Sequence, residues 1–154
     1  MLKVLRVGEP QRTIRADEPR RALKYWNGVI KRQAWFDPSK EHLVTLILST
    51  KSDIEGYSMV SIGNLNQSIA HPREIFRAAI ASGACTIIVM HNHPSGDPTP
   101  SRIDRETMAR LSECGELLDV RLLDFIIVGQ NGAYYSRQEE RCTKSRKRRK
   151  PPPR

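Results

Sequence analysis

The run from residue 91 to residue 104, HNHPSGDPTPSRID, holds the side chains best suited to chemistry. The apolar, β-branched segment before it predicts a strand. Side chains in a strand repeat with period two, so His91 and His93 project from one face with Cα atoms roughly 6.5 to 7 Å apart. Two imidazoles so placed can converge on one metal ion. Pro94 cannot extend a paired central strand, which puts both histidines at the strand's end, while Asn92 points the other way.

Ser101 and Asp104 form an S-x-x-D pattern with two readings. Alone, it is typical of a helix capping box, although aspartate is shorter than the usual glutamate or glutamine. Next to two histidines, it favours Asp104 as a third metal ligand. Two histidines and one carboxylate leave a fourth tetrahedral position for water, as in catalytic zinc sites. Zinc lowers the pKa of bound water to about 7 and polarises carbonyls, which predicts hydrolysis at an acyl centre.

The elements that must position these residues alternate along the chain. Apolar periodicity and turn signals predict helices and strands. The expected helices are 19–30, 72–83 and one from 101 to about 115–119, and the expected strands are 43–50, 57–63, 84–90, 120–129 and 133–136, with a possible short strand at 2–7. The strands 43–50 and 57–63 form a hairpin. The expected fold class is therefore mixed α/β (α+β), with a central mixed β-sheet flanked by helices.

Composition narrows the class of protein. The 154 residues suit one domain. Three cysteines without a C-x-x-C spacing argue against a disulfide framework and for a reducing compartment. No apolar run approaches the ~20 residues needed to span a bilayer, and the N-terminus lacks a signal-peptide core. We therefore expect a cytoplasmic protein without a membrane partner.

Positive charge is concentrated at the C-terminal end. Residues 141–154 hold eight basic and no acidic residues, whereas residues 1–140 carry 18 positive and 17 negative charges. The segment has no apolar periodicity and ends in a proline run, which predicts disorder. It could be a solvated tail, or it could bind nucleic acid electrostatically, and its composition does not choose between these roles.

The metal-site run closely resembles the H-x-H-P…S-x-x-D signature of the MPN/JAB (JAMM) metalloenzymes, and its wording resembles the RadC-type branch. Three further runs fall in that family's order and spacing: KEHLVTLILSTK at 40–51, SIGNLNQSIAHPREIFRAAI at 61–80, and LLDFIIVGQNGAYYS at 122–136. The resemblance covers about residues 18–138. It divides the chain into an N-terminal segment 1–17, an MPN/JAB domain 18–138 and a basic tail 139–154 that we expect to be disordered, and it implies a JAB/MPN-like, cytidine-deaminase-like layered fold.

The resemblance also implies roles for five residues. His91, His93 and Asp104 would hold one zinc ion, Glu41 would be the general base, and Ser101 would hydrogen-bond the oxyanion. It implies a metallopeptidase-like hydrolase of peptide or isopeptide amides that uses a zinc-bound water. Phe125 stands where RadC-type proteins usually have a histidine, so any role of that histidine is absent here. His42, beside Glu41, should face the opposite way as a core or surface histidine.

Other functions remain open at this stage. The alternative is an accessory protein of DNA repair or a mobile element that binds nucleic acid through residues 141–154. A metal-free structural module is a further possibility. Zinc nucleobase deaminases fit worse because their H-x-E and P-C-x-x-C pair is absent. Two-metal nucleases fit worse because they need more ligands than this segment offers.

Overall fold

Strand β1 (His42–Leu48) is buried along its whole length and lies inside the sheet. The computed structural model describes residues 14–63 and 71–148, so the possible strand at 2–7 lies outside the described residues. Within them, a five-stranded sheet has the order β2-β1-β3-β4-β5. The other strands are β2 (Ile54–Ile62), β3 (Thr86–Asn92), β4 (Arg121–Val128) and β5 (Tyr134–Ser136). The predicted mixed sheet flanked by helices is confirmed.

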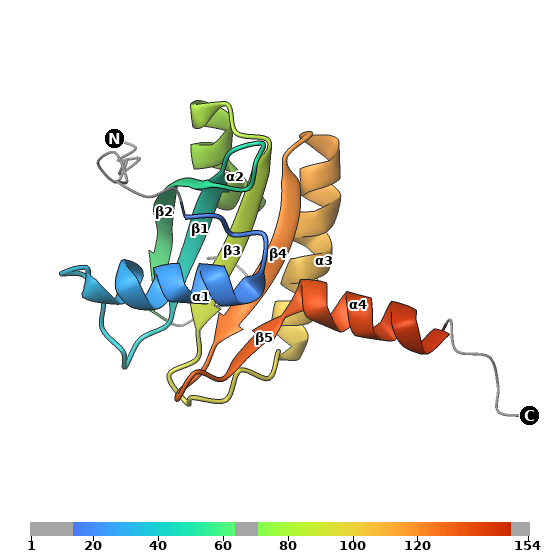
Figure 1. Cartoon of the computed structure of the whole chain (residues 1–154). Coiled ribbons are helices and arrows are strands. Elements are labelled where there is room, and N and C mark those ends of the chain that lie inside the picture. The colour runs from blue at the N-terminus through green and yellow to red at the C-terminus, as the bar shows by residue number, and fades with distance from the viewer. Residues whose placement is uncertain (1–13, 64–70, 149–154) are drawn as a thin grey trace, which may run out of the picture.

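Helices cover both faces of this sheet (Figure 1). Helix α1 (Pro19–Gly28), followed by the short 3-10 turn η1 (Ile30–Arg32), packs on one face, where Trp26 meets residues such as Val44 and Ile88. Helices α2 (Pro72–Ser82) and α3 (Arg102–Leu117) pack on the other, where Phe76 meets residues such as Val89. Because side chains alternate along a strand, each inner strand supplies both cores. The result is a three-layer domain.

Strand pairing fixes where the candidate ligands lie. β1 pairs antiparallel with both β2 and β3, and Leu43 is the partner of His91. The predicted hairpin of β1 and β2 is therefore confirmed. β3 pairs parallel with β4, and α3 makes the crossover between them. The start of β1 and the end of β3 consequently lie side by side.

The C-terminal segment differs from the prediction. Residues 137–148 form helix α4 (Arg137–Arg148), where the sequence analysis expected disorder from residue 139. Two hydrogen bonds cap the start of this helix. The Ser136 hydroxyl accepts from the backbone N–H of Glu139 at 3.2 Å, and the Asp124 carboxylate accepts from that of Gln138 at 3.0 Å. Glu140 then accepts from the Tyr135 hydroxyl at 2.9 Å and pairs with Lys144 at 3.1 Å. Apolar periodicity carries no information about these polar attachments, so it could not predict the helix.

Candidate metal centre

Three side chains converge at the end of β3. His91 is fully buried, His93 is partly exposed, and Asp104 comes from the first turn of α3. The two Nε2 atoms are 3.1 Å apart, and each is 3.5 Å from an oxygen of Asp104. Ligand atoms of tetrahedral zinc with bonds of about 2.0 to 2.1 Å lie roughly 3.3 Å apart. The three residues therefore fit one ion and form a group that could hold a metal.

The capping box and the ligand cluster use the same aspartate. The Ser101 hydroxyl accepts from the backbone N–H of Asp104 at 3.1 Å, and Asp104 Oδ2 accepts from the backbone N–H of Ser101 at 2.7 Å. The cap holds the carboxylate beside both histidines, with Oδ1 nearer His91 and Oδ2 nearer His93. The two readings of S-x-x-D are thus compatible, because the cap orients the candidate ligand.

A hydrogen bond fixes which nitrogen of His93 faces the cluster. Nδ1 lies 2.7 Å from the carbonyl oxygen of Asp97, and a carbonyl can only accept, so Nδ1 carries a proton. In the neutral ring this leaves the lone pair on Nε2, which points at His91 and Asp104. The arrangement is the one that metal-binding histidines commonly have, with the second nitrogen donating to a backbone carbonyl.

The loop that supplies this carbonyl is held against the turn between β4 and β5. The backbone N–H of His93 donates to Val128 at 3.0 Å, and that of Gln130 donates to the carbonyl of Gly96 at 3.0 Å. A side chain at residue 129 would collide with the Gly96 carbonyl, so Gly129 permits this close approach. The prolines and glycine of the loop carry the chain from the strand to the helix in a fixed path.

Burial and hydrogen bonding together set the protonation of the cluster. Burial lowers the pKa of His91 to about 4, against the opposing effect of Asp104. Hydrogen bonding to Asp104 is the main cause that raises the pKa of His93, which is less buried. Burial raises the pKa of Asp104, but hydrogen bonds from His93 and Ser101 and attraction to His91 outweigh it and lower the pKa to about 2. A neutral His91 beside an ionised Asp104 is the state that metal binding requires.

Phe125 forms the apolar wall behind His91. It is 1% exposed, and its ring meets that of His91 edge to face at a centroid distance of 5.4 Å. The residue that departs from the usual RadC-type pattern therefore excludes water from one candidate ligand. Its contribution here is packing and desolvation.

Glu41 and Ser101 border the same pocket as two of the candidate ligands, His93 and Asp104. This pocket has a volume of about 280 Å³ and is lined by Glu41, His93, Pro94, Ser95, Ser101, Ile103 and Asp104. Glu41 is close enough for its charge to help raise the pKa of His93. The five residues singled out from the sequence are thus brought to one place, and their chemical roles stay predictions.

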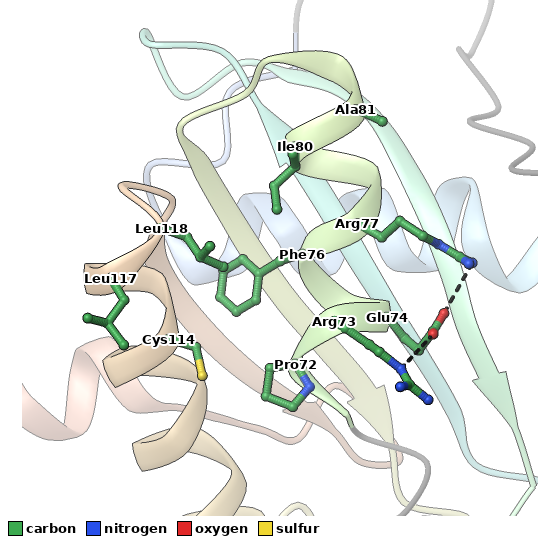
Figure 2. A pocket seen from close by; sticks show the side chains of 10 residues that line it. All are labelled: Pro72, Arg73, Glu74, Phe76, Arg77, Ile80, Ala81, Cys114, Leu117 and Leu118. Atoms are coloured by element: carbon green, nitrogen blue, oxygen red, sulfur yellow. Dashed lines mark ion pairs between the residues drawn. The ribbon is translucent and has the colours of Figure 1, made fainter.

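A larger groove lies elsewhere on the molecule, between α2 and α3 (Figure 2). It has a volume of about 720 Å³ and is mainly apolar, with Phe76, Ile80, Leu117 and Leu118 among its lining residues. The charged residues at its rim neutralise one another, because Glu74 forms ion pairs with Arg73 at 3.3 Å and with Arg77 at 3.2 Å. The smaller pocket at the end of β3 is the one where polar groups suited to metal binding converge.

Two residues of this region were placed by the sequence analysis, but their contacts were not predicted. Asn92 and His42 are both buried and connect the end of β3 to the start of β1 through side-chain hydrogen bonds. The strand alternation correctly placed Asn92 opposite His91 and His93. No signal in the sequence indicated what it meets there, since its partners are about 50 residues away.

Fold and site together define a mixed-sheet domain with an open two-histidine, one-carboxylate cluster. The RadC-like JAB domain model matches residues 16–142, and the chain belongs to this family. The resemblance inferred from the sequence is therefore confirmed.

Several curated relatives share this part of the chain. A UPF0758 protein of Enterococcus faecalis is 50% identical over 101 residues, which are 66% of this chain and 43% of the relative. A UPF0758 protein of Trichlorobacter lovleyi is 52% identical over 100 residues, 65% of this chain and 43% of the relative. One of Desulforudis audaxviator is 44% identical over 126 residues, 82% of this chain and 52% of the relative. The chain spans about half the length of these relatives or less.

The described helices also bear on a membrane role. No helix within residues 14–63 and 71–148 is both long and apolar enough to cross a bilayer.

Proposed function

We propose that this protein is a zinc-dependent hydrolase of JAMM type that cleaves peptide or isopeptide amides. The observation that supports it is the convergence of three candidate ligands at 3.1 to 3.5 Å beside a pocket that His93, Asp104, Glu41 and Ser101 line. His91, His93 and Asp104 would hold the metal. When bound, zinc would supply a water of lowered pKa and polarise the substrate carbonyl.

The protein's own side chains then have distinct tasks. Glu41 takes a proton from the attacking water and delivers it to the leaving nitrogen. The Ser101 hydroxyl uses its oxygen to accept from Asp104, so its proton is available to donate to the developing oxyanion. Phe125 and the other apolar residues around His91 keep water from that side of the site, which strengthens electrostatic interactions within it.

The decisive experiment separates metal binding from proton transfer. Purified protein is analysed for zinc and screened against peptide and isopeptide amides. Glu41→Gln is then compared with Glu55→Gln, the same chemical change at an exposed residue of β2. We expect Glu41→Gln to keep zinc and lose turnover by at least ~100-fold, because general base catalysis contributes about 10²- to 10⁴-fold. Glu55→Gln should behave as the parent.

Two results would contradict this function. Unchanged turnover in Glu41→Gln would rule out Glu41 as the base. Protein that neither retains nor takes up zinc would favour a metal-free structural role for the domain.

A second candidate function, nucleic-acid binding, is favoured by the form of the C-terminal segment. Helix α4 extends away from the sheet in Figure 1, and the described side chains of Arg141 and Lys144 are exposed. Residues 141–154 carry eight basic side chains, and phosphate neutralisation by such charges needs no base-specific contact.

This candidate is tested with a variant of full length in which those eight residues are glutamine. DNA affinity is measured against salt for both proteins. We expect the parent to bind with a steep salt dependence and the variant to lose it, since each phosphate contact contributes about 0.9 to the logarithmic slope. Equal affinity and equal slope in the two proteins would exclude this role.

A further inference from the structure

Asn92 lies between the two candidate ligand histidines and is 7% exposed. Its side chain bonds to the backbone at the start of β1. Oδ1 accepts from the backbone N–H of His42 at 2.9 Å, and Nδ2 donates to the carbonyl of Lys40 at 2.9 Å. These two backbone groups stand on either side of Glu41. One amide therefore fixes the chain before and after the candidate base.

The ring of His42 fixes the orientation of that amide. The backbone N–H of Asp37 donates to His42 Nε2 at 3.3 Å, so the neutral ring carries its proton on Nδ1. Nδ1 in turn donates to Asn92 Oδ1 at 3.3 Å. The ring is held in place by stacking on Phe36 at a centroid distance of 4.6 Å. The backbone N–H and the ring Nδ1–H of His42 are both donors. The side-chain oxygen of Asn92 must therefore face them, and its nitrogen must face the carbonyl of Lys40.

The residue after strand β2 bonds a further backbone group of this segment. The N–H of Gly63, the residue after β2, donates to the carbonyl of Glu41 at 2.9 Å. The carbonyls of Lys40 and Glu41 and the N–H of His42 are thus all bonded, two of them to Asn92. A short strand start that bordered solvent would otherwise fray, and Asn92 ties it to the strand that carries His91 and His93.

We propose that Asn92 is a positioning residue that holds Glu41 beside the metal ligands. The proposal rests on the proposed function for the importance of Glu41, but the structural link itself does not require a metal. A general base must lie within hydrogen-bond reach of its proton, and a misplacement of about 1 Å can cost on the order of 100-fold in rate. Asn92 points away from the pocket, so it acts through Glu41 alone.

The test replaces the amide with an apolar group of similar size. Asn92→Leu removes both bonds, and Asn92→Ser, too short to make them, serves if the leucine variant does not fold. Ile88→Val in the middle of β3 is the matched control for a change in the same buried strand. Crystal structures and amide hydrogen exchange are compared for all of them, with and without added zinc.

In the Asn92 variants we expect the Glu41 carboxylate to move by about 1 Å or more while His91, His93 and Asp104 stay superposed. The His42 amide should exchange at least ~10-fold faster, with the Thr45 amide unchanged as an internal reference. On any amide substrate that Glu41→Gln cleaves measurably but at least ~100-fold more slowly than the parent, kcat of the Asn92 variants should fall by on the order of 100-fold with little change in KM. The double variant with Glu41→Gln should be no slower than Glu41→Gln.

Distinct results would overturn distinct claims. An unmoved Glu41 with a fully protected His42 amide would refute the role of Asn92, as would a double variant whose losses multiply. Failure of the parent protein to bind zinc would refute the proposed function, while the position of Glu41 in the metal-free variants would still decide whether Asn92 holds it.

Discussion

Asp104 and Asp124 are both buried carboxylates that accept a backbone N–H at the start of a helix, yet their surroundings differ. Asp104 belongs to α3 itself, whereas Asp124 reaches the start of α4 from strand β4. Asp104 is 7% exposed, lies within 3.5 Å of two imidazoles and borders a pocket. Asp124 is 1% exposed and accepts from the Ser136 hydroxyl and the backbone N–H groups of Phe125 and Gln138, all neutral donors. A carboxylate at a helix start lines a candidate metal site in one place and attaches helix α4 to the sheet in the other.

The pKa values of the two carboxyls separate accordingly. For Asp124, burial outweighs its three hydrogen bonds and raises the pKa to about 6. For Asp104, the histidines and the capping bonds outweigh burial and lower the pKa to about 2. A helix start therefore does not by itself make a site. The partners of the carboxylate and its access to solvent decide what it does.

The largest expected effect is on zinc affinity. Asp104→Ala removes one of three ligands, so we expect affinity to fall by at least ~1000-fold, about 4 kcal/mol at 1.4 kcal/mol per factor of ten. Asp124→Asn, the matched control at the other helix start, should bind zinc as the parent does. Competition with a chelator of known affinity measures both. Equal losses in the two variants would erase the distinction between the carboxylates.

The second effect is a dependence of stability on pH. The folded pKa of Asp124 lies above its ordinary value of 3.8, so its favourable contribution is complete below that value and is lost as the pH rises toward about 6. The difference amounts to about 3 kcal/mol at 1.36 kcal/mol per pKa unit.

Asparagine at residue 124 would not titrate, and its amide could still donate to Ser136. The free energy of unfolding of the parent, minus that of Asp124→Asn, should therefore decrease by about 3 kcal/mol between pH 3.5 and pH 7. Denaturant unfolding across this range measures it. A difference that stays constant with pH would show that Asp124 is not the buried acid described here.

The smallest effect concerns the cap that orients Asp104. Ser101→Ala removes the acceptor for the backbone N–H of Asp104 and should cost about 1 kcal/mol of stability, whereas Ser101→Thr keeps the acceptor and most of that stability. Thermal unfolding without metal measures this term alone. Loss of stability in the threonine variant as large as in alanine would argue that the hydroxyl is not the cap.

Much of this protein could be predicted from local patterns. The sheet, the hairpin and the main helices follow from apolar periodicity, proline at helix starts and glycine at helix ends; Gly83, for example, ends α2 with a positive φ of 69°. The period of two placed His91 and His93 on one face. These signals are local because they depend on the geometry of a single strand or helix.

The remaining features depend on contacts between distant segments. Helix α4 was missed because Asp124, Ser136 and Tyr135 attach it through polar bonds that leave no apolar pattern. The contacts of Asn92 could not be predicted because its backbone partners, at Lys40 and His42, lie about 50 residues away at the start of β1. Neither the polar bonds that attach α4 nor the backbone bonds of Asn92 produce a repeating pattern of residues in the sequence.

The sequence by itself determined the chemistry available: two imidazoles, a carboxylate that caps a helix, and a family signature that named Glu41 and Ser101. The tertiary structure decided that these groups meet. Glu41 is 50 residues from His91, and the antiparallel pairing of Leu43 with His91 brings them together. That pairing is chosen by the burial of both sheet faces over the whole domain, which no short segment can specify.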